Sequence, residues 1–199
     1  MIMSVKKSPL SFFFSTNRLK VISFLAKFHD AEFHERDIAR RTGVSYGSAN
    51  KILNELHAAG VLLRHQKGKM LFYKFNPHDP ALRHLKKTLN IELLRPLVAT
   101  LKETCSRIVL YGSCARGDDT ASSDVDLYII TESADKVSRV IRTFRFGRGF
   151  DDIEIEPVIL SPLDMLKSEK TDPEFLSLVR EGIVLWDSST HETGVQEVS

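Results

Sequence analysis

The chain has 199 residues, of which 42% are hydrophobic, and only 10 glycines and 7 prolines, a composition that favours a folded protein. This length suits one large domain or two small domains, each able to bury a core. No uncharged apolar run approaches the roughly 18 residues of a membrane-spanning helix, which argues against a membrane protein. The two cysteines, Cys105 and Cys114, fit no metal-binding pattern, and we expect free thiols in a cytoplasmic protein.

The formal net charge of +2 conceals an uneven distribution along the chain. Residues 1–106 hold 18 Lys and Arg against 8 Asp and Glu, a net charge of +10, whereas residues 107–199 hold 10 against 18, a net charge of −8. Two halves of opposite charge favour two domains with different partners. A basic half suits a polyanion such as nucleic acid, and an acidic half suits cations.

The basic half opens with two helical patterns. Ser15 and Thr16 are candidate N-caps of a helix that ends near Phe28. Ile38 and Ala39 give a short second helix its apolar contacts.

A turn and a further helix follow. Gly43 can supply the positive φ angle that a tight turn requires, and Ser45 can cap the helix after it. Gly60 lies where a helix C-terminus favours glycine. The apolar residues between them are spaced by three and four positions: Ala49, Ile52, Leu53 and Leu56. The pattern therefore predicts a helix, a turn with glycine, and a second helix.

After Gly60, the segment VLLRHQKGKMLFYKFN indicates two strands joined by a basic turn at residues 66–69. Element order, the short turn at Gly43 and the phrase ILNELHAAGVLLR together resemble the winged helix-turn-helix domain of ArsR-type and MarR-type repressors. The resemblance covers about residues 15–78, and we assign residues 1–78 to this domain. It implies binding to double-stranded DNA and a role in transcription regulation.

Polar residues on the second helix and the hairpin can reach DNA once the apolar residues face the core. Small polar side chains near the helix N-terminus suit base edges and phosphates, and basic side chains on the hairpin suit the phosphate backbone. A winged helix used only for dimerisation or protein docking is the alternative. The candidate DNA-binding residues are Ser45, Tyr46, Ser48, Asn50, Lys51, Asn54, Arg64, Lys67 and Lys69.

Residues 79–106 connect the two halves. Their leucines recur with a helical rhythm that Pro96 interrupts, which predicts a connector of one or two helices. Because such helices often carry a dimer contact beside winged helices, we expect a homodimer.

The acidic half begins with a short apolar run, residues 107–111, of buried-strand character. Gly112 and Ser113 follow directly, and glycine lets a backbone approach a ligand while serine offers a hydroxyl. Arg116 lies three residues further on and can add a guanidinium for phosphate. A Gly-Ser turn alone is a weak signal for a phosphate site.

The next strand carries two acids on one face. Strand alternation places Asp124 and Asp126 on one side and Val125 and Leu127 on the other. Two carboxylates on one face repel each other, and a divalent cation with oxygen ligands resolves this repulsion. Mg²⁺ usually keeps waters and substrate phosphates as its remaining ligands.

A third acid is expected on the following strand candidate, residues 151–160. Glu154 and Glu156 share a face there, and Glu156 lies nearer the apolar segment. We therefore choose Glu156 as the third carboxylate.

The acidic half as a whole resembles the nucleotidyltransferase superfamily, especially its minimal members from prokaryotes. The family signature G-S-x-A-R-G appears at residues 112–117, and S-D-x-D-L appears at residues 123–127 after a spacer of five residues. The resemblance extends to residue 187. It implies an α/β domain with a small mixed sheet at residues 107–187, so that the chain as a whole is α+β; we expect residues 188–199 to be a disordered tail.

The resemblance also implies roles for residues that match the motif. Gly112, Ser113 and Ser123 would bind the nucleotide, which is ATP or another nucleoside triphosphate, and Arg116 would either assist the phosphates or pair with an acid. The carboxylates that would bind Mg²⁺ and serve catalysis are Asp124, Asp126 and Glu156.

Two hypotheses follow for the whole chain. In the first, the protein is an enzyme that transfers NMP to an acceptor hydroxyl; since minimal nucleotidyltransferases often act as antitoxins on a HEPN-type toxin, such a protein acceptor is implied. In the second, the domain is a catalytically silent nucleotide sensor in a transcriptional regulator. Glu156 stands where the family usually has aspartate, which favours the second hypothesis, and the intact motif favours the first.

Overall fold

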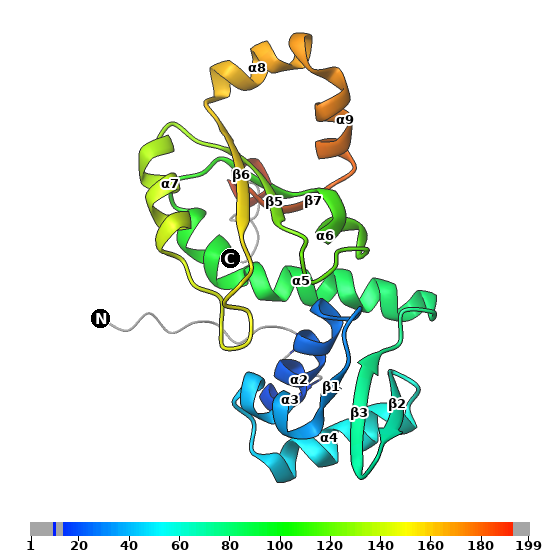
Figure 1. Cartoon of the computed structure of the whole chain (residues 1–199). Helices are drawn as coiled ribbons and strands as arrows, with labels where there is room; N and C mark the ends of the chain where they lie inside the picture. Colours follow the sequence, from blue (N-terminus) through cyan, green and yellow to red (C-terminus); the bar gives the residue numbers. More distant parts are fainter. Residues whose placement is uncertain (1–9, 11–13, 193–199) are drawn as a thin grey trace, which may run out of the picture. The chain divides into compact units, whose positions relative to one another are not determined.

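A computed structural model of the protein describes residue 10 and residues 14–192, which divide into two compact units (Figure 1). Unit 1 comprises the described residues up to Glu92 together with Gly147–Asp151, and unit 2 comprises Leu93–Phe146 and the described residues from Asp152 onward. The boundary falls within helix α5 (Pro80–Leu101), which contains Pro96. The expected mixture of helices and small sheets is confirmed.

Three helices form most of the core of unit 1: α2 (Thr16–Lys27), α3 (Glu35–Thr42) and α4 (Tyr46–Ala58). The Ser15 side chain accepts a hydrogen bond from the backbone N–H of Arg18, which caps α2. Gly43 ends α3 with a φ angle of 67°, a conformation that favours glycine. The fully buried side chains include Phe24, Leu25, Ile38 and Leu53.

A three-stranded antiparallel sheet completes unit 1. Its strands are β1 (Phe33–His34), β2 (Leu62–Lys67) and β3 (Met70–Phe75), in the order β1-β3-β2. Strands β2 and β3 form a hairpin, and Gly68 adopts a φ angle of 61° at its turn.

A segment distant in sequence also belongs to unit 1. The Phe150 ring stacks on Phe28 with 6.3 Å between the ring centroids and lies edge-on to Phe24 at 6.4 Å. A Cβ atom added at Gly149 would lie 2.9 Å from the carbonyl oxygen of Arg41. The absence of a side chain at Gly149 therefore lets the segment pack closely against Arg41. Nothing in the sequence pattern predicted this membership.

The centre of unit 2 is a four-stranded sheet of β4 (Arg107–Leu110), β5 (Val125–Ile130), β6 (Ile155–Leu160) and β7 (Ile183–Asp187). The strand order is β6-β5-β4-β7. Strands β5 and β6 are parallel, whereas β4 pairs antiparallel with both β5 and β7. The small mixed sheet expected for this half is therefore present.

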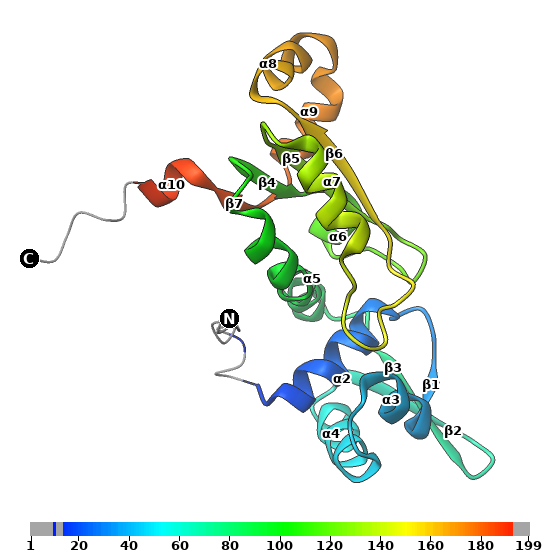
Figure 2. The same cartoon turned by 90° about the vertical axis from the view of Figure 1, so that its left-hand side faces the viewer.

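Helices connect the strands of this sheet, and a last helix follows β7. They are α6 (Gly112–Arg116), α7 (Ala134–Thr143), α8 (Pro162–Thr171), α9 (Pro173–Arg180) and α10 (Ser188–Glu192). Tyr128 and Ile130 of the sheet pack with Leu176 and Val179 of α9 in one apolar cluster. Helix α7 lies beside β6 (Figure 2). Of the tail expected to be disordered, residues 188–192 form α10, and residues 193–199 lie outside the described part of the chain.

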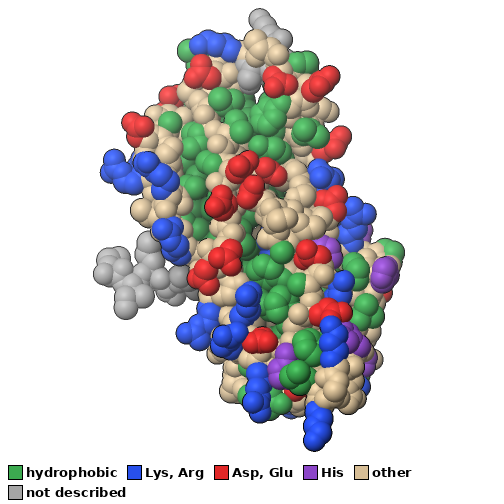
Figure 3. Space-filling model, in the orientation of Figure 1, with side chains coloured by type: hydrophobic (Ala, Val, Ile, Leu, Met, Phe, Trp, Pro, Cys, Tyr) green, Lys and Arg blue, Asp and Glu red, His purple; other side chains and the backbone are tan. Residues whose placement is uncertain are grey.

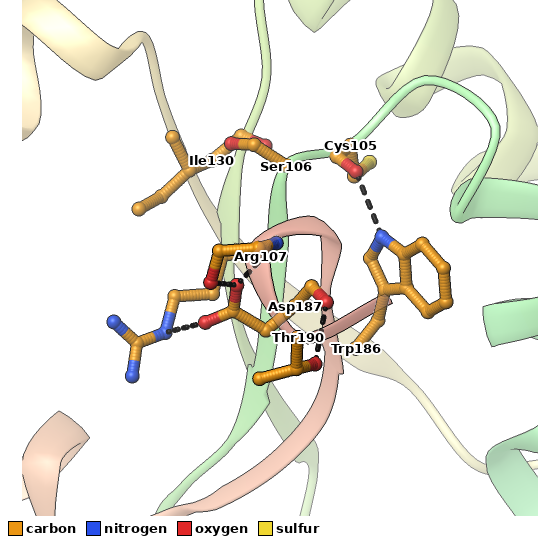
Figure 4. A network of polar contacts seen from close by, with 8 residues as sticks. Cys105, Ser106, Arg107, Ile130, Trp186, Asp187 and Thr190 are labelled. Carbon is orange, nitrogen blue, oxygen red and sulfur yellow. Dashed lines mark hydrogen bonds and ion pairs between the residues drawn. The ribbon is translucent and has the colours of Figure 1, made fainter. Parts of the chain in front are cut away.

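Polar contacts fasten the edge strand β7 to the rest of the sheet (Figure 4). The indole N–H of Trp186 donates to the backbone carbonyl of Cys105 at 3.0 Å, and Arg107 Nε lies 3.6 Å from Asp187 Oδ2. The backbone N–H of Ser106 donates to the carbonyl of Ile130, which extends the connection to β5. These contacts join β7 and the start of β4 to the last residue of β5.

Within the part of the chain that the structure describes, every helix is too short or too polar to cross a membrane.

Candidate active site

Two of the predicted carboxylates lie on neighbouring parallel strands. Asp126 is the second residue of β5, Glu156 is the second residue of β6, and the two are direct partners in the strand register. Because paired residues of adjacent strands point to the same face of a sheet, their side chains share one face and one end of the sheet. The choice of Glu156 over Glu154 agrees with this register, since Glu154 precedes the strand.

The glycine turn lies against the same acid. Gly112 begins α6 one residue after the end of β4 and adopts a φ angle of 68°. A Cβ atom added at this position would overlap the carboxylate of Asp126. The absence of a side chain therefore allows the turn and the Asp126 carboxylate to meet, and the structure brings together the two parts of the motif that the sequence separates.

The surroundings of Asp126 disfavour the ionised form of its carboxyl group. Burial, the neighbouring Glu156 and the neighbouring Asp124 all raise the pKa of Asp126, and Arg116 lowers it to a smaller extent. Burial, followed by the charges of Asp126 and Glu156, also raises the pKa of the Tyr111 hydroxyl. Such clustered like charges are typical of functional sites, where a cation or substrate relieves the repulsion.

The positions of these acids decide whether they can bind a divalent cation. Among the described residues, no group of three or more His, Cys, Asp and Glu side chains is gathered closely enough to hold a metal ion. Asp126 and Glu156 nevertheless share a face, and one or two carboxylates suffice for Mg²⁺, which takes its other ligands from waters and substrate phosphates. The donor chemistry therefore fits Mg²⁺ that arrives with a triphosphate.

Two residues of the motif have structural partners. Arg116 Nε lies 3.1 Å from Asp118 Oδ2 in an exposed ion pair, so the pairing alternative for this residue is the arrangement observed. The Ser123 hydroxyl accepts a hydrogen bond from the backbone N–H of Thr120 at 2.9 Å, which closes the loop before β5. Ser113 lies in α6 beside Gly112 and is partly exposed.

Aromatic residues near the acids were not among the predicted site residues. Tyr111 immediately precedes Gly112, and its ring meets Phe175 of α9 edge-on at 5.6 Å. Phe175 also packs against Tyr128 at 6.1 Å. An aromatic residue directly before a Gly-Ser turn is the sequence signal that could have indicated Tyr111.

The surface of unit 2 shows the same concentration of charge. A group of acidic side chains lies over β5 and β6, with hydrophobic side chains around it, and basic side chains project over α7 (Figure 3). Carboxylates thus gather in one group on this face of the two parallel strands.

In unit 1, several predicted DNA-binding residues join a network around Glu35, whose side chain is buried. The Tyr46 hydroxyl donates to Glu35 Oε2 at 2.9 Å, and Asn50 Nδ2 donates to Glu35 Oε1 at 3.0 Å. The buried Tyr73 hydroxyl donates to Glu35 Oε1 at 3.2 Å. Sequence reasoning missed Glu35, because a buried acid at a helix start has no distinctive pattern.

The network continues to the hairpin. Asn54 Nδ2 donates to Asn50 Oδ1 at 3.2 Å, and Arg64 Nη1 donates to Asn54 Oδ1 at 3.1 Å. The chain of bonds therefore links α3, α4 and β2 through side chains on the surface expected to face DNA. We call Glu35, Tyr46, Asn50, Asn54, Arg64 and Tyr73 the unit 1 polar network.

The other predicted residues lie around this network. Ser45 caps α4, because its hydroxyl accepts from the backbone N–H of Ser48. Lys51 and Lys69 are exposed, and Lys67 Nζ pairs with Glu32 Oε2 at 2.8 Å. The positions are compatible with a polar surface along α4 and the hairpin.

Two carboxylates on neighbouring parallel strands beside a glycine turn can bind a divalent cation together with substrate phosphates. Residues 97–191 match the family model described as polymerase beta, nucleotidyltransferase. Most of unit 2 is therefore similar to a nucleotidyltransferase domain. The match includes none of the elements from α2 to β3, and comparison with curated proteins gives no match.

Proposed function

We propose that the protein transfers a nucleoside monophosphate from a nucleoside triphosphate to an acceptor hydroxyl. The observation that carries this proposal is the pairing of Asp126 with Glu156 beside Gly112, within residues that match a nucleotidyltransferase model. Gly112 and Ser113 would contact the triphosphate, which ATP or another nucleotide supplies.

The reaction forms one bond and breaks another. The acceptor oxygen bonds to the α-phosphorus, the bond between that phosphorus and the oxygen bridging to the β-phosphate breaks, and pyrophosphate leaves. The hydroxyl proton is released to solvent. Asp126 and Glu156 are register partners on β5 and β6, and the positioning of such groups is a large part of catalysis in phosphoryl-type transfers.

Mg²⁺ bound by Asp126 and Glu156, with Asp124 nearby, would neutralise charge on the phosphates. The raised pKa of Asp126 supports this assignment, because the same neighbours that raise it are the acids a cation would draw together. Arg116, though paired with Asp118, is exposed and near enough to lower the pKa of Asp126.

For unit 1 we propose a winged helix-turn-helix that binds double-stranded DNA. Three helices followed by a hairpin, a glycine turn between α3 and α4, and a polar surface on α4 support this proposal. We also propose that the protein acts in transcription regulation and forms a homodimer. A toxin-like protein is the acceptor that the resemblance implies.

A second candidate function is nucleotide sensing without turnover. Two observations favour it: the third acid is a glutamate, and no three-acid group among the described residues is close enough to hold a metal ion. In that case unit 2 would bind nucleotide and alter the DNA affinity of unit 1 without releasing pyrophosphate.

Labelled ATP distinguishes the two candidates. The native chain and an Asp124→Ala, Asp126→Ala double variant are incubated with α-labelled ATP, Mg²⁺ and cell lysate. Transfer predicts label on a macromolecule with the native chain only. Saturable ATP binding by the native chain, with no label in any fraction, would contradict transfer and support sensing.

A further inference from the structure

The short segment Gly147–Asp151 belongs to unit 1, although the residues on both sides of it belong to unit 2. Its Phe150 ring is 7% exposed and packs against Phe24 and Phe28. The backbone N–H of Phe150 donates to the carbonyl of Gly147 at 3.1 Å, which closes the segment into a tight turn. A buried ring therefore fastens a piece of the acidic half of the chain to unit 1.

Arg148 of this segment lies against the turn between α3 and α4. A Cβ atom added at Gly43, the C-cap of α3, would lie 3.2 Å from Arg148 Cδ and 3.3 Å from Arg148 Nη1. The turn continues to Ser45, the N-cap of α4, two residues further on. The absence of a side chain at Gly43 thus lets the guanidinium group stand directly beside the turn.

The Arg148 side chain is exposed, and its positive charge is unpaired. Among the residues that the structure describes, none forms an ion pair, hydrogen bond or ring contact with it. The arginines in the last turn of α3 differ, because Arg40 pairs with Asp37 and Arg41 lies over the Phe24 ring. An unpaired guanidinium group beside a basic helix end attracts an anion.

A helix-turn-helix on DNA places phosphates near the turn between its helices. The N-terminal residues of the second helix enter the major groove, while the first helix crosses the phosphate backbone. The turn that joins α3 to α4 would therefore lie at the edge of the groove. An arginine beside this turn can reach a phosphate, and its planar group of N–H donors suits phosphate oxygens.

We propose that Arg148 binds a backbone phosphate of double-stranded DNA at the turn between α3 and α4. This contact rests on the DNA binding proposed for unit 1. It adds to α4 and the hairpin a residue from between α7 and β6, in the half of the chain where the sequence indicates a nucleotide site. Contacts to phosphate position a protein on DNA without reading its sequence.

The test compares single variants of the full chain. Arg148→Gln removes the proposed contact, and Arg148→Lys keeps the charge. The control is Arg139→Gln, which removes an exposed arginine from α7 and leaves unit 1 unchanged. Affinity for a short fluorescein-labelled DNA duplex of mixed sequence is measured at a series of salt concentrations.

One lost phosphate contact should reduce the slope of log affinity against log salt by about 0.9 in Arg148→Gln. Arg148→Lys and Arg139→Gln should keep the native slope. The loss of affinity should be the same for duplexes of different sequence, because the contact reads no bases. An unchanged slope in Arg148→Gln, or an equal reduction in Arg139→Gln, would overturn the proposal.

Protection of a thiol locates the contact independently of affinity. Cys105 and Cys114 are buried, so Arg148→Cys and Arg139→Cys each introduce a single exposed thiol. With saturating duplex, we expect a maleimide to modify the Arg148→Cys variant more slowly and the Arg139→Cys variant at an unchanged rate. Equal rates with and without duplex in Arg148→Cys would overturn the contact.

A hairpin variant separates failure of this contact from failure of DNA binding as a whole. If Lys67→Ala, Lys69→Ala flattens the salt slope and Arg148→Gln does not, the hairpin binds DNA and Arg148 does not. If the native chain does not bind the duplex, both the contact and the DNA binding proposed for unit 1 are wrong.

Discussion

Asp126 has the least favourable electrostatic surroundings among the carboxylates of the site. It is partly buried, faces Glu156 across the parallel strands, and has Asp124 nearby. A fold gains nothing in stability from such an arrangement, because the like charges repel. We therefore attribute the acids to binding rather than to stability.

Replacing Asp126 with asparagine should stabilise the metal-free protein at neutral pH. Because the pKa of Asp126 is raised in the folded state, its charged form opposes folding once the pH exceeds the ordinary value of 3.8, and this opposition is complete above the folded pKa. The gain in Asp126→Asn should vanish at pH values below 3.8. Urea unfolding followed by fluorescence of Trp186, the sole tryptophan, checks this in EDTA.

Asp164→Asn should change the stability of the protein in the opposite direction to Asp126→Asn. The Ser161 hydroxyl and Lys167 lower the pKa of Asp164, so its carboxylate stabilises the fold at neutral pH, and this contribution is lost as the pH falls through the folded pKa. We expect this variant to be less stable than the native chain at neutral pH and equal to it in acid. A change in stability in the same direction for Asp126→Asn and Asp164→Asn at neutral pH would contradict the environments assigned to these two carboxylates.

Gly112→Ala should damage the site by geometry alone. The left-handed backbone conformation costs about 1 to 2 kcal/mol for a residue with a Cβ, and the added atom would also displace the Asp126 carboxylate. We expect the free energy of unfolding to fall by at least about 1 kcal/mol and nucleotide affinity to fall with it. Gly47→Ala is the control, because no atom lies within 4 Å of a Cβ there, and it should be neutral or stabilising. Urea unfolding measures both.

At the scale of elements, the unit 1 polar network fixes α3, α4 and the hairpin relative to one another. Its centre is the Glu35 carboxylate, which accepts from Tyr46, Asn50 and Tyr73. A buried carboxylate that satisfies three donors holds the first turns of α4 in place more firmly than apolar packing alone. Two of the predicted DNA-binding side chains are thus oriented before any ligand binds.

Glu35→Gln should weaken this connection. The amide offers one acceptor oxygen in place of two, and its own N–H groups face donors, so we expect the free energy of unfolding to fall by about 2 kcal/mol. Glu55→Gln is the control, because among the described residues the Glu55 side chain pairs only with Arg18, in an exposed ion pair, and it should cost less than about 1 kcal/mol. Urea denaturation followed by circular dichroism compares them. Equal losses would show that burial of Glu35 carries no special stabilisation.

Two lysines of the hairpin give a separate prediction for DNA binding. Lys67 and Lys69 flank the turn at Gly68, and both are exposed. If both contact phosphates, Lys67→Ala, Lys69→Ala should flatten the salt dependence of duplex DNA binding by about 2 in slope. Lys20→Ala, Arg83→Ala removes the same charge from other elements of unit 1 and should leave the slope unchanged. An unaltered slope in the hairpin variant would contradict the prediction that the hairpin binds DNA.

At the scale of the whole molecule, local signals explain most of what could be predicted from the sequence. The caps Ser15 and Ser45 and the turn at Gly43 mark helix ends because each acts within a few residues. Strand alternation and a family motif pointed to Asp126 and Glu156 as site residues, whereas their pairing on neighbouring parallel strands is seen only in the fold. Helix caps and glycine turns of this kind do not depend on tertiary packing, and the structure contains them where the sequence predicts them.

What the sequence did not predict depends on contacts between distant residues. Gly147–Asp151 lies between α7 and β6 in the chain but belongs to unit 1, where Phe150 packs against Phe24 and Phe28. Glu35 meets partners up to 38 positions away. No periodicity or cap signals such contacts, because their energy comes from burial and hydrogen bonds formed only after folding.

The central claim is that Asp126 and Glu156 form a site for NMP transfer, and labelling the donor at two positions tests it most directly. The native chain, Glu156→Gln and the neighbouring control Glu154→Gln are each supplied with ATP labelled at the α-phosphate or at the γ-phosphate. The account predicts transfer of the α-label only, a loss of about 100-fold in Glu156→Gln, and near-native transfer in Glu154→Gln. Transfer of the γ-label, or equal activity of the two glutamine variants, would contradict it.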